Sequence, residues 1–177
     1  LHTFFSDDAL ARCVAHVRRG AEEAGRGPAS GRVWAVLGTV GDHLPQDLRL
    51  KKLIGRLATY CQAYGDLIVS TNDWDPAVLD AFRADPTVQS MTGAIDAVAT
   101  NAELESIAEL FPDEWLDASA TGSPDRCAAR VLDQFDAGAD SVILHGATPD
   151  ELAPVLDAYR TVRPAGRFTD LAANPGR

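Results

Sequence analysis

The clearest pattern of hydrophobic and polar residues lies at positions 123–146. Ser123 can cap a helix, and Pro124 suits the first helical turn, where a missing N–H loses no partner. Apolar side chains then recur every three or four residues as far as Phe135, which predicts a helix with one buried face. A short apolar run at 141–144 follows without alternation, as in a strand buried on both faces of a parallel sheet. Helix, strand and further helix in this order predict an α/β fold.

A second apolar run, at residues 32–40 (RVWAVLGTV), is the most convincing strand of the chain. Its uninterrupted apolar residues indicate a central strand of a parallel sheet. Gly38 and Gly41 lie near its end, where the backbone can approach a ligand closely. A weaker strand is predicted at 115–121, chiefly because the helix after Ser123 needs a strand before it.

Helices are predicted between and around these strands. One begins at the cap Ser6, a second covers residues 48–64, and the last covers 150–162 with Asp150 as its cap. Strand signals largely disappear between residues 42 and 115, and we interpret these residues as a helical insertion. In α/β enzymes such an insertion often lies at the active site, although it can equally be a packing element.

These units amount to a strand end followed by three strands, with a helix after each. They represent about half of an eightfold β/α barrel, which typically needs about 250 residues. The alternative is a small, complete, doubly wound sheet. The apolar start Leu1–Phe5, without an initiator Met, favours the half-barrel. We therefore expect residues 1–177 to form a single α/β domain: the C-terminal half of a (β/α)8 TIM-type barrel, belonging to a longer enzyme.

Composition narrows the class of protein further. The chain of 177 residues is 46% hydrophobic and 24% charged, as in an ordinary globular domain, and its net charge is −10. This acidity disfavours nucleic acid and anionic membrane surfaces as partners. No apolar run approaches the roughly 20 residues of a membrane span, and no signal peptide is visible. Three widely separated cysteines without a CxxC pair indicate reduced core thiols in a cytoplasmic protein.

The histidines are the first candidates for chemistry. His2 and His145 fall at predicted C-terminal ends of strands, which form the catalytic face of a barrel. Each would either contact a cofactor or substrate or pack as a neutral, hydrogen-bonded imidazole. His43 follows the strand at 32–40 on the same face and could reach the site, whereas His16 is expected to be exposed. No His or Cys spacing matches a set of zinc ligands, so no metal site is expected.

Three further residues are candidates for binding an anion. Thr3 and Ser6 lie at a strand exit and a helix N-terminus, where free N–H groups and the helix dipole favour a phosphate. The acidic Asp7 and Asp8 lie close to such an anion, and Ser6 can equally be a plain helix cap. Arg56 on the helix at 48–64 forms either an ion pair or a contact to an anionic ligand.

The segment GSPDRCAARVLDQFDAGADSVILHG, followed by TPDELAPVLDAYR, resembles the closing barrel units of the bacterial luciferase-like monooxygenase superfamily. The resemblance also covers Gly55-Arg56 with Tyr60 and Tyr64, and the opening LHTFFSDDAL, which is similar to the exit of the fifth barrel strand. The block at 72–76 (NDWDP) and the segment at 112–115 (PDEW) look closest to the branch that uses a deazaflavin.

The resemblance implies an oxidoreductase in which a flavin-type ring lies at the C-terminal mouth of the barrel. The implied cofactor is the 8-hydroxy-5-deazaflavin coenzyme or, alternatively, FMN, and the substrate is a small molecule of unspecified identity. Thr3, Ser6 and Arg56 are then candidate cofactor contacts, and His2 and His145 are candidate catalytic residues. In this family the first strands supply most ring contacts, so we expect this chain alone to be inactive. The exposed sheet edges of a half-barrel also predict a homo-oligomer. The alternative function is a self-contained α/β binding or interaction domain without catalysis.

Overall fold

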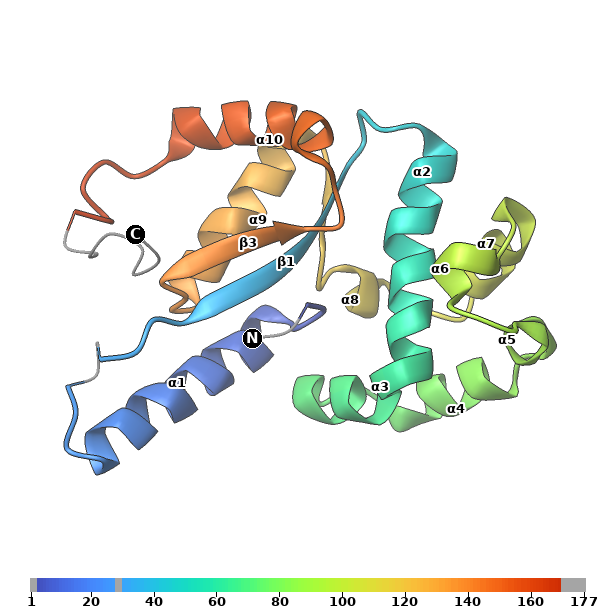
Figure 1. Ribbon diagram of the computed structural model, residues 1–177, viewed down its shortest axis with the longest axis horizontal. Helices are drawn as coiled ribbons and strands as arrows, with labels where there is room; N and C mark the ends of the chain where they lie inside the picture. The colour runs from blue at the N-terminus through green and yellow to red at the C-terminus, as the bar shows by residue number, and fades with distance from the viewer. Residues whose placement is uncertain (1–2, 28–29, 170–177) are drawn as a thin grey trace.

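The structure is a computed structural model that describes residues 3–27 and 30–169. Figure 1 shows two parts: a small β-sheet with helices around it, and a block of helices formed by the middle of the chain. The chain enters the helical block after the first strand and leaves it before the second. The helical middle segment and the mixed α/β class are therefore confirmed.

The sheet contains three strands: β1 (Trp34–Gly41), β2 (Ala120–Gly122) and β3 (Ser141–His145). Around it lie α1 (Asp7–Glu23), α9 (Pro124–Asp136) and α10 (Pro149–Val162). The helical block comprises α2 (Gln46–Leu50), the π-helical turn η1 (Lys51–Gly55), α3 (Arg56–Asn72), α4 (Pro76–Ala84), α5 (Pro86–Ser90), α6 (Ile95–Val98), α7 (Asn101–Ala108) and α8 (Asp113–Leu116).

Local capping signals explain where the helices around the sheet begin. The hydroxyl groups of Ser6 and Ser123 accept hydrogen bonds from the backbone N–H of the third residue of α1 and of α9, each at 3.2 Å. The prediction that Asp150 caps the last helix was wrong. Thr148 is the cap instead, because it forms a reciprocal capping box with Glu151.

All three strands are parallel, in the order β2-β1-β3. β1 is thus central, as predicted, whereas β3 lies at an edge of the sheet. Consecutive strands of a barrel pair in chain order, which would place β3 beside β2. The expected half of an eightfold barrel is therefore not confirmed.

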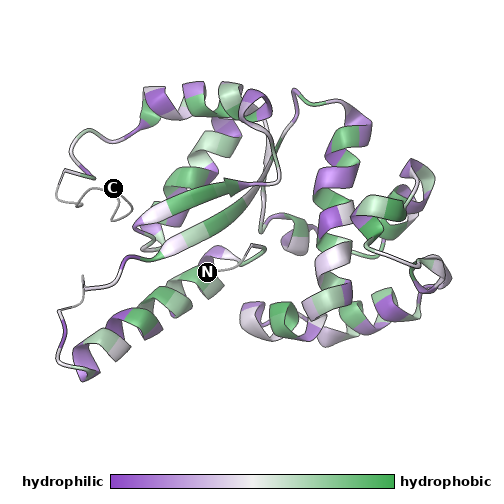
Figure 2. Ribbon diagram, viewed as in Figure 1, coloured by the Kyte–Doolittle hydropathy of each residue, from purple (hydrophilic) through white to green (hydrophobic). Residues whose placement is uncertain are grey.

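The two faces of the sheet differ in how they are covered. Residues of β1 and β3 that are in register share a face, so Leu37 and Leu144 lie on one side. That side packs against α9 and α10, around Cys127 and Val155. On the opposite side Ile143 is 44% exposed. In Figure 1, α9 lies behind the strands and no helix of the described residues crosses in front of them, and Figure 2 shows that the strands consist largely of hydrophobic residues. The prediction that 141–144 is buried on both faces was wrong.

The helix predicted at 48–64 is longer than expected and interrupted. It runs from α2 through η1 and α3 to Asn72, with a kink at Tyr64. The helix continues past Gly65, and the missing side chain there leaves room for Leu79 of α4. The strand predicted at 115–121 is shortened to β2, because residues 113–116 form a helical turn that buries Trp115 completely.

The larger hydrophobic core lies within the helical block. Trp115 stacks on Trp74 with ring centroids 4.6 Å apart, and Phe82 and Phe111 extend this aromatic cluster. Phe4, from the segment before α1, joins the same core against Tyr60. Among the described residues, no helix combines the length and apolar character needed to cross a bilayer.

Candidate functional site

The carboxyl ends of the parallel strands place three residues in one row across the sheet. Gly38 of β1 pairs with His145 of β3, and Ser119, which immediately precedes β2, lies level with Gly38 on the other side. A Cβ atom added at Gly38 would lie 3.0 Å from Ser119 Oγ. Glycine therefore allows Ser119 to lie over the central strand, and the hydroxyl of Ser119 is buried there without a hydrogen-bond partner.

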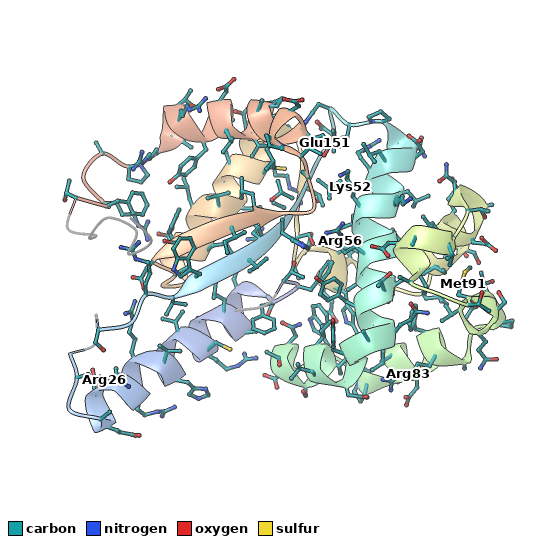
Figure 3. The ribbon with its side chains drawn as sticks, viewed as in Figure 1. Arg26, Lys52, Arg56, Arg83, Met91 and Glu151 are labelled. Atoms are coloured by element: carbon teal, nitrogen blue, oxygen red, sulfur yellow. The ribbon has the colours of Figure 1, made fainter. Side chains whose placement is uncertain are left out.

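Arg56 extends from α3 to the end of this row. Its Nη1 atom lies 3.3 Å from Nε2 and 3.5 Å from Nδ1 of His145. Because Nη1 is almost equidistant from both ring nitrogens, the guanidinium contacts the imidazole as a whole and not one lone pair. Figure 3 shows Arg56 directed from its helix toward the sheet. Two residues predicted separately from the sequence, 89 positions apart, are thus brought into contact.

The π-helical turn η1 immediately precedes Arg56. π-helical turns are rare and occur frequently at functional sites. This turn packs closely against α6, since a Cβ atom at Gly55 would lie 3.1 Å from the backbone of Asp96. Thr59 also accepts a hydrogen bond from the Asp96 N–H and donates one to its carboxylate. These contacts with α6 fix the position of the backbone from which Arg56 extends.

Lys52 connects η1 to the loop after β3. Its ammonium group donates to the carbonyl of Gly146 at 2.8 Å and to the carboxylate of Glu151 at 3.0 Å. The N–H of Thr148 and, secondarily, Lys52 hold the pKa of Glu151 below its ordinary value. Figure 3 shows Lys52 and Glu151 close together above Arg56. His43 contacts the backbone carbonyl of Glu151 at 2.8 Å, so it lies at this edge of the sheet, as predicted.

Thr3 lies beside Gly38, and Ser6 follows three residues later at the start of α1. Thr3 is 2% exposed, and its hydroxyl oxygen would be 3.6 Å from a Cβ atom at Gly38. Ser6 is the cap of α1, so its hydroxyl already accepts a backbone hydrogen bond. Their roles as phosphate contacts stay predictions. His2, the other catalytic candidate, lies outside the described residues.

An open cleft of about 460 Å³ adjoins Ser6. Asp7, Asp8, Glu114 and Asp117 line it together with two arginines. Arg130 is engaged by Asp7, with contacts of 2.6 and 3.0 Å, and by Asp133. Because carboxylates outnumber arginines on its walls, this cleft suits an anion poorly.

Sequence reasoning missed Lys52 and Ser119. A signal for Lys52 was available, since it lies one turn before Arg56 on the same predicted helix. Ser119 carried none, because its position depends on the pairing of β1 with β2. Among the described residues, no three His, Cys, Asp or Glu side chains are grouped so that they could hold a metal ion.

The arrangement combines a hydrophobic surface with a polar, cationic border. The partly exposed Val36 and Ile143 form the surface, and Arg56 and His145 form the border at the carboxyl end of the strands. Such a surface can hold a planar heterocycle, while the guanidinium donates hydrogen bonds to its polar edge. Comparisons with models of protein families, with curated proteins and with solved structures find no match for this chain.

Proposed function

We propose that this chain is the C-terminal part of a luciferase-like oxidoreductase that uses the 8-hydroxy-5-deazaflavin coenzyme, with FMN as the alternative cofactor. The observation that carries the proposal is the contact of Arg56 with His145 at the carboxyl edge of a parallel sheet with one open, hydrophobic face. The site fits such a group: the Nε atom of Arg56 is buried without a hydrogen-bond partner, and Ile143 offers apolar area beside it.

In this proposal the residues bind and orient the cofactor, which itself supplies hydride chemistry when bound. Val36 and Ile143 would contact the ring, and Arg56 and His145 would fix its polar edge. Further strand–helix units would cover the open face and exclude water, so the chain alone binds without turnover.

A fluorescence titration of the 177-residue chain with each cofactor tests the proposal. We expect saturable binding of the deazaflavin coenzyme, about tenfold weaker in Arg56→Met because a charge-assisted hydrogen bond is lost. The control is Arg26→Met, which removes the same charge from an exposed position near the far end of α1. Absence of binding by both the deazaflavin and FMN rejects the proposal.

The strand order favours a second candidate, a self-contained α/β binding or interaction domain. The order β2-β1-β3 is compatible with a complete small sheet in which β3 keeps its place beside β1. This candidate predicts that neither the deazaflavin coenzyme nor FMN binds the chain in the titration above, whereas saturable binding of either cofactor favours the first candidate.

A further inference from the structure

We infer that Arg56 and His145 form a binding site for an oxyanion, the carboxylate or phosphate group of a small-molecule ligand. The inference deepens the proposed function by naming the charged group that this site takes, and it rests on that function only for the identity of the rest of the ligand.

The first argument is the pairing of the arginines. Seven other arginines contact a carboxylate within 4.0 Å, namely those at positions 12, 18, 83, 126, 130, 160 and 167. Arg56 contacts none among the described residues, and neither do Arg19, Arg26, Arg49 and Arg163. Arg56 differs from these four because it lies beside a histidine at the carboxyl edge of the sheet. A half-buried arginine beside a histidine and without a carboxylate leaves a positive charge at this edge that an anion from outside the chain can neutralise.

The second argument is burial. Arg56 is half-buried, and its Nε atom is inaccessible to solvent without a hydrogen-bond partner. A buried donor on a charged group is unfavourable unless it is paired. The edge of a guanidinium formed by Nε and one terminal nitrogen matches the two oxygens of a carboxylate or phosphate. An oxyanion reaching this edge after a small side-chain movement would satisfy the orphaned donor.

The third argument is the surrounding backbone, which leaves space at Arg56 and fixes its position. Gly146 has a φ of +91°, and a Cβ atom there would lie 3.4 Å from Nη1 of Arg56. This φ favours glycine, and the backbone of Gly146 therefore lies directly against the guanidinium. Lys52 holds the same loop through the Gly146 carbonyl, while its own charge is compensated by Glu151. The cationic group that remains uncompensated is Arg56.

The net charge of the chain disfavours a ligand that carries many negative charges. At −10, the chain repels an extended polyanion, and the described residues at this site offer one arginine and one histidine. The site therefore suits a small molecule with a single oxyanion group.

Nuclear magnetic resonance titrations of the full 177-residue chain with inorganic phosphate and, separately, with acetate test the inference at constant ionic strength. We expect saturable shifts of the Arg56 Nε–H and His145 ring resonances. Binding should weaken about tenfold in Arg56→Met and partly recover in Arg56→Lys, which restores the charge without the fork of donors. Arg26→Met should leave the affinity unchanged, because its guanidinium lies far from the site. The phosphate and acetate titrations distinguish the two kinds of oxyanion.

The inference is overturned if the wild-type chain shows no saturable shift at Arg56 with either anion. It is also overturned if the Arg56→Met variant binds an anion as tightly as the wild-type chain does. The wild-type result alone decides the matter if the variant fails to fold. Binding of the deazaflavin without binding of either anion rejects this inference and leaves the proposed function. Binding of an anion without either flavin-type cofactor rejects the proposed function and leaves this inference.

Discussion

The buried amide group of Asn72 joins the segment before α1 to the helical block. The side chain of Asn72 donates hydrogen bonds to the carbonyl groups of Phe4 and Ile68, and its oxygen accepts one from the Ser6 N–H. Phe4 has a φ of +62°, a conformation that costs free energy in a residue with a side chain. The Asn72 contacts hold this strained residue in place, and with it the segment beside Gly38.

Replacing Asn72 with alanine should therefore lower the free energy of unfolding by about 2–3 kcal/mol, since three backbone groups lose a hydrogen bond. Urea denaturation measures this change. Ser70→Ala is the matched control, because its exposed hydroxyl bonds only to Leu67 within the same helix. A loss for Asn72→Ala no larger than that of the control would show that the amide does not hold the segment.

The buried thiols give a prediction about reactivity and pH. Burial raises the pKa of Cys61 to about 12 and that of Cys127 to about 11. Alkylation of the folded chain at about pH 8 should therefore modify the partly exposed Cys13 first, because only thiolates react. The unfolded thiols ionise near pH 9.0, so stability should fall as pH rises from there toward 12. Modification of all three thiols at equal rates in folded protein would contradict this assignment.

At the scale of elements, the approach of α4 to α3 depends on one glycine. A Cβ atom at Gly65 would lie 2.6 Å from Cδ1 of Leu79, which is buried in the larger core. Gly65→Ala should destabilise the chain by about 1–3 kcal/mol, because the core is overpacked. Gly20→Ala, in α1, should stabilise it by about 1 kcal/mol, since nothing lies within 4 Å of the new atom. Thermal unfolding of both variants gives the comparison, and a stabilised Gly65→Ala chain contradicts the packing described here.

The sequence predicted elements well where their signals are local. Ser6 and Ser123 were correctly identified as caps, because a cap depends only on the residues that follow it within one turn. The burial of 141–144 was not predictable in this way. An uninterrupted apolar run has the same pattern in a central strand as in an edge strand with one open face. The contact of Arg56 with His145 was equally hidden, since it depends on how the helical block packs against the sheet.

At the scale of the whole molecule, the open face predicts self-association. β3 is an edge strand without charge or proline, and Ile143 is 44% exposed on the open face. Such edges pair with other chains unless a charge interrupts them. Sedimentation velocity should show concentration-dependent association of the wild-type chain, shifted toward monomer in Ile143→Lys. Val98→Lys, at a similarly exposed position of the helical block, should have no effect. A wild-type chain that is monomeric at every concentration would contradict this prediction.

The central claim is that a flavin-type cofactor binds at the carboxyl edge of the open sheet face. Mapping the backbone amide shifts of the full chain during a titration with the deazaflavin coenzyme tests it most directly. We predict that the shifted amides cluster at Gly38, His145 and Gly146 and on η1 beside Arg56. Shifts that are absent, or that cluster instead around the acidic cleft beside Ser6, would contradict the account.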